Sequence, residues 1–412
     1  MKMQITEKLE WGKYARPSEN KQSAIHNWFV YHHSFGKTLV SEILNELKLD
    51  RKARVLDPFC GSGTTLLVCQ HKGIECVGMD LMPLSILVSR AKTNHYSVVN
   101  LRNTFKKIES SLDRIDSYPK PDISIINKAF TQKAWDQIQS IREVVETRSC
   151  GKVRDFFLTG LLGVVSSFGA YSNDGGFPRL VRRPKVPLKD LQLTFMNRVN
   201  KMTNEVELCN SLHQYDGGRV PIIITHDARN TLNKLGRFDA IVTSPPYPNR
   251  HDYTRVYTAE LAAAFLKNNE ELKKLRARLF RSHIEAKPDD TVSLIDEIRP
   301  FIKILRALRE SPKADDRVPG MLRAYYQDME KTLSAIWKLL KPNAVAAIVV
   351  GNVRFSGVMV PVDEITALIG RNIGFISQGI LVIRYRGNSP QQMRDFGKIT
   401  SRESIVMLRK GA

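Results

Sequence analysis

The sequence contains little cysteine and no long apolar segment. Its five cysteines, Cys60, Cys69, Cys76, Cys150 and Cys209, include no Cys-x-x-Cys pair, so we expect no metal site and no disulfide framework. No run of 18 or more apolar residues is present, which predicts that no helix spans a membrane. Because the first 20 residues are polar and lack an apolar signal core, we expect a cytoplasmic protein.

Acidic residues are scarce relative to basic ones. The 412 residues include 63 Lys and Arg against 42 Asp and Glu, which gives a net charge of +21 and a pI near 9.8. When such an excess neutralises phosphates it releases condensed counterions, which favours a nucleic acid as partner. A merely basic protein is the alternative, because net charge says nothing about the fold.

Strand and helix patterns alternate in two parts of the chain. The segments "ARVLDPF" and "IECVGMD" are predicted strands, separated by a glycine loop and a helix. This βαβ unit implies a parallel sheet. Further strands are predicted at "VPIIIT", "FDAIVTS" and "AVAAIVVG", and two long ones near the end of the sequence. We therefore predict a doubly wound α/β domain, formed by residues 26–99, 219–257 and 320–412, with a mostly parallel sheet and a C-terminal antiparallel hairpin.

Three other segments precede or interrupt this domain. Residues 1–25 are predicted to be a loose basic arm. Residues 100–218 and 258–319 show helical periodicity and are predicted to be helical insertions, the second rich in basic residues. Both insertions are candidate target-recognition regions; we expect the first to read the bases, with its loop "GGFPRLVRRPKVP" close to a nucleic-acid backbone. The basic residues of this loop are Arg179, Arg182, Arg183 and Lys185; a surface charge cluster is the alternative.

The glycine loop "DPFCGSGTT" follows a predicted strand and runs from Asp57 to Thr65. It lacks the lysine of a phosphate-binding loop and the third glycine of a dinucleotide fingerprint. Asp57 would repel a phosphate and attract an amine. Asp80, at the end of the next strand, is placed to accept hydrogen bonds from ribose hydroxyls. These features favour a nucleoside that carries positive charge, such as S-adenosylmethionine; the alternative is a tight turn with no ligand.

A second motif, "TSPPY", lies just past another predicted strand. Pro245 and Pro246 remove two N–H donors, which leaves the Ser244 side chain and nearby carbonyl groups as acceptors. Tyr247 adds a ring for stacking. Acceptors beside a ring suit the amino group of a flat base. Since ligands of open parallel sheets bind at the carboxyl ends of the strands, we expect both motifs to form one pocket.

With both motifs in place, the chain resembles the S-adenosylmethionine-dependent DNA amino methyltransferases. "DPFCGSGTT" resembles their cofactor motif and "TSPPY" their catalytic motif, while "VGMD", "THDAR" and "HHSFGKTLVSEI" resemble further cofactor-binding segments. The resemblance implies a Rossmann-like class I methyltransferase fold with S-adenosyl-L-methionine as cofactor. The implied catalytic residues are Ser244, Pro245, Pro246 and Tyr247. The implied cofactor-binding residues are Phe35, Asp57, Pro58, Phe59, Gly61, Ser62, Gly63, Thr64, Thr65, Asp80, Leu81 and Asp227.

The implied reaction is direct methyl transfer to the exocyclic N4 amine of a cytosine flipped out of duplex DNA. Hydrogen bonds from the amine to Ser244 and to the Pro245 carbonyl would return its lone pair to nitrogen, and the base would stack on Tyr247. Carbon-5 methylation is disfavoured, because it uses a thiol after a proline and none of the five cysteines follows one. The residues expected to line the base pocket or hold phosphate are Asn249, Arg250, Tyr253 and Arg255; a solvated loop is the alternative.

Three other functions stay open at this point. Adenine-N6 DNA methyltransferases more often carry Asp or Asn in place of Ser244, so the serine favours cytosine-N4. RNA guanine-N2 methyltransferases usually carry Asp there, and a non-catalytic DNA-binding scaffold would not need both motifs intact. On the leading interpretation the partners are double-stranded DNA and a cognate restriction endonuclease that acts on the same site.

Overall fold

A mixed sheet of eight strands forms the centre of the protein. The computed structural model describes all residues except 1–2, 32–33, 113–114, 175–176, 213–217 and 388–389. Within these residues the strand order is β1-β11-β12-β8-β7-β2-β3-β6. The strands are β1 (Ile5–Glu7), β2 (Arg54–Asp57), β3 (Glu75–Asp80), β6 (Ile222–Thr225), β7 (Phe238–Thr243), β8 (Leu340–Gly351), β11 (Phe375–Arg386) and β12 (Ser401–Lys410).

The sheet is parallel except at one strand. β6, β3, β2, β7 and β8 all pair in parallel, and β12 pairs antiparallel with both β8 and β11. This confirms the predicted doubly wound fold with an antiparallel C-terminal pair. The chain order reverses between β2 and β7, and such a switch point is where open α/β sheets bind ligands, beyond the carboxyl ends of the strands.

Helices cover both faces of the sheet. On one face, α1 (Lys37–Glu46) and α2 (Thr64–His71) pack on the central strands in a shared apolar core. On the other face, α13 (Arg317–Leu339) and α14 (Val362–Ile373) form a second core with the strands. Strands buried on both faces explain the nearly continuous apolar runs of β7 and β8.

The N-terminal segment is not a loose arm, so that prediction was wrong for its described residues. β1 adds to the sheet edge, with Ile5 opposite Ile380. Trp11 and Ile25 are buried and attach the segment to the apolar core. The basic composition of the segment did not indicate these contacts. The segment continues through three short 3-10 helices, η1 (Leu9–Tyr14), η2 (Glu19–Lys21) and η3 (His26–Trp28).

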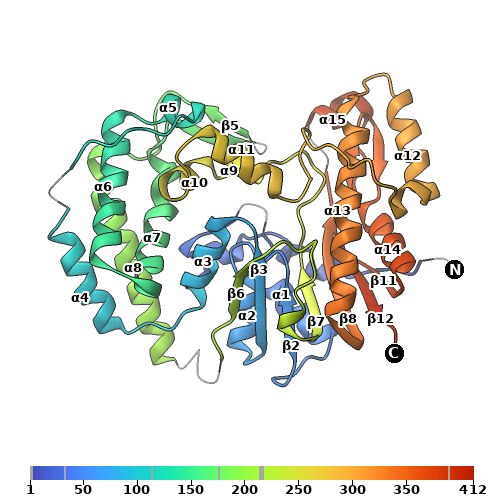
Figure 1. Cartoon of the computed structure of the whole chain (residues 1–412), viewed down its shortest axis with the longest axis horizontal. Coiled ribbons are helices and arrows are strands. Elements are labelled where there is room, and N and C mark those ends of the chain that lie inside the picture. Colours follow the sequence, from blue (N-terminus) through green and yellow to red (C-terminus); the bar gives the residue numbers. More distant parts are fainter. Residues whose placement is uncertain (1–2, 32–33, 113–114, 175–176, 213–217, 388–389) are drawn as a thin grey trace.

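Residues between β3 and β6 build a helical lobe at the left of Figure 1. Its elements are α3 (Pro83–Thr93), α4 (Val98–Glu109), α5 (Ser124–Ala129), α6 (Gln132–Arg148), α7 (Gly151–Val165), η4 (Ser166–Phe168), β4 (Tyr171–Asp174), β5 (Phe177–Leu180), η5 (Leu188–Asp190) and α8 (Leu191–Ser211). The lobe has its own core around Trp135, Phe156, Phe157 and Phe195, all fully buried. α3 contacts both β3 and α7, and so joins this lobe to the sheet.

The segment after β7 runs from this lobe back towards α13, above the carboxyl ends of the strands (Figure 1). Its elements are α9 (Tyr253–Val256), α10 (Thr258–Ala264), α11 (Asn269–Arg278), η7 (Leu294–Glu297) and α12 (Arg299–Glu310). α10 packs on α7, and Arg281 binds Asp328 of α13 through two hydrogen bonds of 2.6 and 3.0 Å. This segment, here called the covering segment (residues 253–310), is therefore fixed to the helical lobe and to α13, and it covers the switch point.

The remaining short elements are η6 (Asn233–Leu235), β9 (Val353–Phe355), β10 (Val358–Val360) and α15 (Pro390–Phe396), which connects β11 to β12. Within the described residues, no helix is both long and apolar enough to cross a membrane. The same residues contain no group of three or more His, Cys, Asp or Glu side chains placed to hold a metal ion.

Candidate active site

The two sequence motifs meet at the carboxyl edge of the sheet. β2, which precedes the glycine loop, pairs directly with β7, which precedes "TSPPY". The Thr243 hydroxyl donates a hydrogen bond of 2.7 Å to Asp57 Oδ1, although the two residues are far apart in sequence. The parallel pairing thus brings both motifs into one site.

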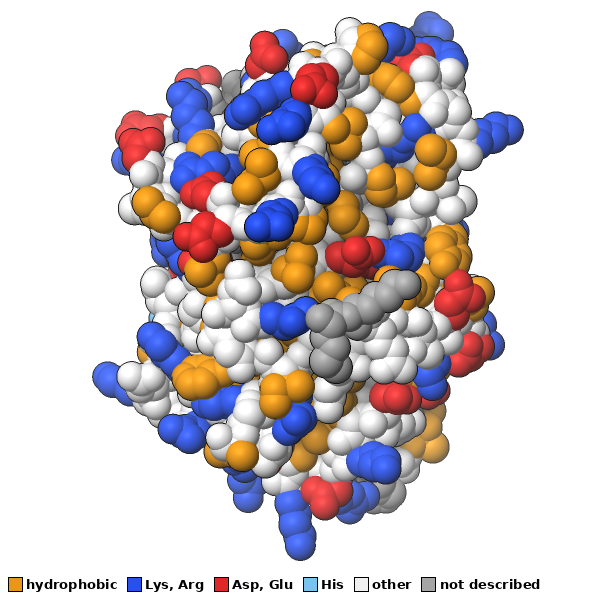
Figure 2. Space-filling view, turned by 90° about the vertical axis from the view of Figure 1, so that its right-hand side faces the viewer, with side chains coloured by type: hydrophobic (Ala, Val, Ile, Leu, Met, Phe, Trp, Pro, Cys, Tyr) orange, Lys and Arg blue, Asp and Glu red, His pale blue; other side chains and the backbone are white. Residues whose placement is uncertain are grey.

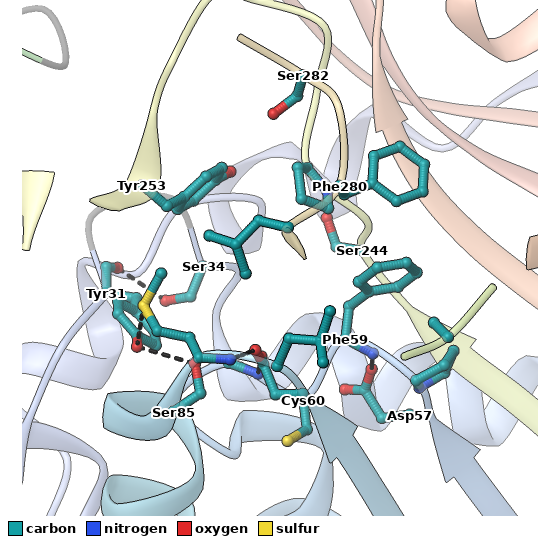
Figure 3. Close-up of a pocket in the computed structure, with 18 of the residues that line it drawn as sticks. Tyr31, Ser34, Asp57, Phe59, Cys60, Ser85, Ser244, Tyr253, Phe280 and Ser282 are labelled. Atoms are coloured by element: carbon teal, nitrogen blue, oxygen red, sulfur yellow. Dashed lines mark hydrogen bonds between the residues drawn. The ribbon is translucent and has the colours of Figure 1, made fainter. Parts of the chain in front are cut away.

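A pocket, here called the first pocket, opens between the motifs (Figure 3). Among the predicted cofactor-binding residues it is lined by Phe35, Asp57, Pro58, Phe59, Gly61, Ser62, Thr64, Thr65, Asp80, Leu81 and Asp227. Ser244, Pro246 and Tyr253 line it from the other side of the switch point. Gly63 does not line it. Its φ of 79° lies in the left-handed region, which glycine adopts without strain, so the turn before α2 requires it. An added Cβ would also lie only 2.9 Å from the Cβ of Ser89, so the close packing of α2 on α3 requires it too.

Asp57 is a buried acid on the floor of the first pocket. Besides Thr243, the backbone N–H of Phe59 donates to its Oδ1 at 3.1 Å. Burial raises the pKa of Asp57 from 3.8 to about 6, and the hydrogen bond from Thr243 only partly opposes this. A carboxylate kept in this environment without a counter-ion is unfavourable, so the site is suited to a cationic ligand group such as an ammonium.

Asp80 ends β3 and is held rigidly by the backbone. Oδ2 accepts from Gly61 N–H at 3.0 Å, and Oδ1 accepts from Met82 N–H at 2.8 Å. Burial raises the pKa of this carboxyl as well. Each carboxylate oxygen can accept a further hydrogen bond, and Asp80 lines the first pocket, so it can accept from ligand hydroxyls.

Asp227, which follows β6, lines the same pocket but is already paired. Arg229 donates to both of its carboxylate oxygens, at 2.9 and 2.7 Å, and also to Asp328 at 3.0 Å. Burial opposes ionisation of Asp227, but the hydrogen bonds from Arg229 outweigh it and lower the pKa. Asp227 is thus a fixed, charged wall of the pocket.

A second pocket adjoins the first and shares Ser34, Ser244 and Tyr253 with it. Pro245 and Tyr247 line this second pocket, so the "TSPPY" motif lies at the junction of the two. The Tyr247 hydroxyl donates to Glu403 Oε1 of β12 at 3.0 Å, and Arg384 of β11 pairs with the same carboxylate. Burial raises the pKa of Tyr247, so its hydroxyl stays protonated and continues to donate.

The other residues predicted to contact DNA fall into two groups. Asn249 and Tyr253 line the second pocket. Arg250 and Arg255 line neither pocket: Arg250 forms an ion pair with Asp315 at 3.4 Å, and Arg255 pairs with Asp252 and with Glu285 on the covering segment. The structure therefore gives these two guanidinium groups protein partners.

The basic loop lies on the helical lobe. Arg179, Arg182, Arg183 and Lys185 are exposed and line neither pocket. β5, which contains Arg179, packs against α9, the helix that follows the "TSPPY" motif. On the face shown in Figure 2, Lys and Arg side chains are spread over the whole surface rather than gathered in one patch. Net charge alone therefore does not locate a nucleic-acid site.

Several lining residues were missed from the sequence. Tyr31 forms a hydrogen bond of 2.9 Å with Ser85 at one end of the first pocket, four residues before the predicted Phe35. Tyr31 directly precedes the segment "HHSFGKTLVSEI", which resembles a cofactor-binding segment, so this resemblance could have indicated Tyr31 as well. Phe280, on the covering segment, packs edge-on against Phe59 with ring centroids 5.4 Å apart. No local pattern marks Phe280, because only the return of its segment to α13 brings it to the site.

Comparison with known proteins agrees with this geometry. Residues 5–86 match the family described as DNA methylase, which comprises N6 and N4 enzymes. The chain is similar to the type II methyltransferase M.BsoBI of Geobacillus stearothermophilus, with 27% identity over 95% of this chain and 86% of that protein. It is also similar to M.AvaI of Nostoc sp. (26% identity, 99% and 91% coverage) and to M.MvaI of Kocuria varians (24%, 84% and 81%).

Fold and site together define a Rossmann-like methyltransferase that uses S-adenosyl-L-methionine. The buried acid Asp57 fits the ammonium of this cofactor, and Asp80 fits its ribose hydroxyls. Within this class, the match of residues 5–86 and the similar type II methyltransferases support the DNA amino methyltransferase family, which covers both cytosine-N4 and adenine-N6 enzymes.

Proposed function

We propose that this protein is a site-specific DNA methyltransferase that transfers a methyl group from S-adenosyl-L-methionine to the N4 amine of a flipped-out cytosine in duplex DNA. The observation that carries the proposal is the position of Ser244. It lines both the pocket suited to the cofactor and the adjoining pocket that contains Tyr247. A side chain shared by both pockets can hold the target nucleobase, which accepts the methyl group, beside the methyl donor.

The first pocket positions the cofactor, which when bound supplies an electrophilic methyl group on its sulfonium. On this proposal Asp57 accepts the ammonium and Asp80 the ribose hydroxyls. Phe35, Tyr31 and Phe280 exclude water from the pocket with their rings. Fixing donor and acceptor in line contributes a large part of the rate enhancement expected for such a transfer.

The second pocket receives the target base. The base amine donates to Ser244 Oγ and to the Pro245 carbonyl, which localises its lone pair on nitrogen for attack on the methyl group. As the N–CH3 bond forms, the S–CH3 bond of the donor would break to leave a neutral thioether, and the methylated amine would release one proton to water. Tyr247 stacks on the base, and Glu403 holds the phenol ring in place through its hydroxyl. Because a paired base cannot reach this depth within the double helix, the nucleotide must leave the stack.

Cytosine is proposed over adenine because position 244 is serine, the form usual for cytosine-N4 enzymes. The relatives named above are type II methyltransferases. We therefore also propose that a restriction endonuclease acting on the same site accompanies this chain. The basic loop, with Arg182 and Arg183 exposed, is proposed to contact the DNA backbone.

Sequencing of methylated bases in DNA from cells that express the chain tests base, atom and site together. N4-methylcytosine at one short motif is the expected result; N6-methyladenine would replace the cytosine assignment, and unmodified DNA would contradict the function.

Two variants test the assigned chemistry. Ser244→Ala and Tyr247→Ala are expected to abolish methyl transfer while cofactor binding, measured by calorimetry, survives. The exposed Ser110→Ala on the helical lobe is the control and should keep full activity. Full activity in either active-site variant would contradict the mechanism.

A further inference from the structure

One wall of the second pocket has no role in the proposed chemistry. It is formed by the N-terminal segment, through residues 15–18 and Lys21. This segment was expected to be a loose arm, yet it lies beside Ser244 and Tyr247. Its two basic side chains in the lining are Arg16 and Lys21.

The wall is held in place, because the two residues between Ser18 and Lys21 are hydrogen-bonded at the start of α1. Glu19 accepts from both the backbone N–H and the hydroxyl of Thr38, each at 2.8 Å. Asn20 donates to the Phe35 carbonyl at 2.9 Å and accepts from Lys37 N–H at 3.0 Å. The hydrogen bonds of Glu19 and Asn20 thus fix the backbone between Arg16 and Lys21.

Arg16 and Lys21 are themselves exposed at the pocket. Within the part of the chain that the structure describes, neither makes a side-chain hydrogen bond or an ion pair. Two cations held on a fixed wall without protein partners are available to a ligand, and little conformational freedom of the backbone is given up when they bind it.

The charge of the second pocket is strongly one-sided. Among the described residues, four basic side chains line it: those of Arg16 and Lys21, and those of Arg384 and Arg386 of β11. The acid in the same lining, Glu403, is neutralised by Arg384 and also accepts from Tyr247. The excess of cations fits an occupant that carries negative charge as well as a flat ring.

We propose that Arg16 and Lys21 bind the phosphodiester groups that flank the flipped-out nucleotide. This inference rests on the proposed function and adds a binding site for the backbone to it. A base that enters the second pocket brings its sugar and two phosphates to the pocket mouth, and Arg and Lys are the side chains that bind phosphate most strongly. The N-terminal segment then fixes the register of the DNA against Ser244.

The test compares two charge-matched double variants. Arg16→Gln with Lys21→Gln removes the proposed phosphate-binding groups. Arg51→Gln with Lys52→Gln removes the same charge from the exposed turn before β2, at the opposite end of the strands. DNA affinity is measured for both variants and for the wild type between about 50 and 200 mM salt. The salt slope, which is the change of log affinity with log salt concentration, should be less steep by about 1.8 when two phosphate-binding cations are removed. When the salt is raised over this range, the loss of affinity should therefore be about tenfold smaller for the first variant than for the wild type. The second variant should keep the wild-type slope.

A charge-retaining variant guards against a folding defect. Arg16→Lys with Lys21→Arg should keep the wild-type slope, and cofactor affinity should be equal in all variants. If the slopes of the two Gln variants are the same, the inference is overturned.

Neutral backbone analogues test where these cations bind. With the target base mapped, methylphosphonates replace the two phosphates that flank it. This change should weaken binding by the wild type more than binding by the Arg16 and Lys21 double variant, because that variant lacks the two cations proposed to pair with these phosphates. An equal decrease in affinity for both proteins would refute the assignment. A wild type that methylates no DNA contradicts the proposed function itself, an outcome distinct from equal behaviour of the variants.

Discussion

Replacement of Asp57 by Asn should stabilise the protein without cofactor while it weakens cofactor binding. Burial raises the pKa of Asp57 from 3.8 to about 6, so at neutral pH the folded state holds a carboxylate in an unfavourable place. A shift of about two units corresponds to roughly 3 kcal/mol, and the neutral amide avoids most of this cost. The amide keeps an oxygen that can accept from Thr243 and Phe59.

The sign of the pH dependence follows from the raised pKa. Between pH 3.8 and 6 the unfolded chain has already released its proton while the folded protein retains it, so wild-type stability falls as the pH rises through this window. The difference in stability between the Asp57→Asn variant and the wild type should therefore be small near pH 4 and grow to at most about 3 kcal/mol by pH 7.

Urea unfolding from pH 4.5 to 8, with and without S-adenosylmethionine, measures both effects. Without cofactor, the variant should be more stable than wild type at pH 7. With saturating cofactor this advantage should shrink by about 2 kcal/mol, because removal of the proposed charged partner of the ammonium weakens binding roughly thirtyfold. The control is Asp50→Asn, an exposed acid that carries the same charge. A variant less stable than wild type at pH 7, or one that binds the cofactor equally well, would refute the reasoning.

Two further predictions concern the second pocket and the basic loop. In Gly351→Ala the new Cβ would lie 2.5 Å from Arg386 Nη2 and 2.9 Å from Tyr247 Cε2, so methyl transfer should fall on the order of tenfold to hundredfold with cofactor affinity unchanged. Gly411→Ala, with no atom within 4 Å of the added Cβ, is the control in the same rate assay, and equal rates would contradict the proposed role of Tyr247. Arg182→Gln with Arg183→Gln should weaken DNA binding and reduce its salt slope by about 0.9 for each phosphate that these arginines neutralise in the wild type. An unchanged slope would remove this loop from the DNA interface.

The parallel sheet and the meeting of the two motifs were predicted correctly, because each depends on a short sequence pattern. Strand periodicity and the glycine loop predicted the parallel sheet, because a buried strand and a sharp turn each impose their own short pattern. The rule that ligands bind beyond the carboxyl ends of strands then placed Asp57 and Ser244 in one site.

Predictions were wrong or incomplete where distant segments decide the outcome. The N-terminal segment has a basic composition, but β1 finds its partner in β11, with Ile5 opposite Ile380. Neither segment contains a local sequence pattern that predicts pairing with a strand so far away in the chain. For the same reason Glu403, the partner of the Tyr247 hydroxyl, could not be identified before the positions of β12 and β7 were known.

The sequence by itself therefore determined the class of fold and located the two motifs proposed to bind the cofactor and to act on the base, since each depends on residue types at short, fixed spacing. Only the tertiary structure decided which side chains form the walls around them. It placed Arg16 and Lys21 beside Ser244, and it gave Arg250 and Arg255 protein partners. The physical reason is that a pocket is enclosed by whichever segments pack at the sheet edge, and that packing depends on burial of apolar surface across the whole chain.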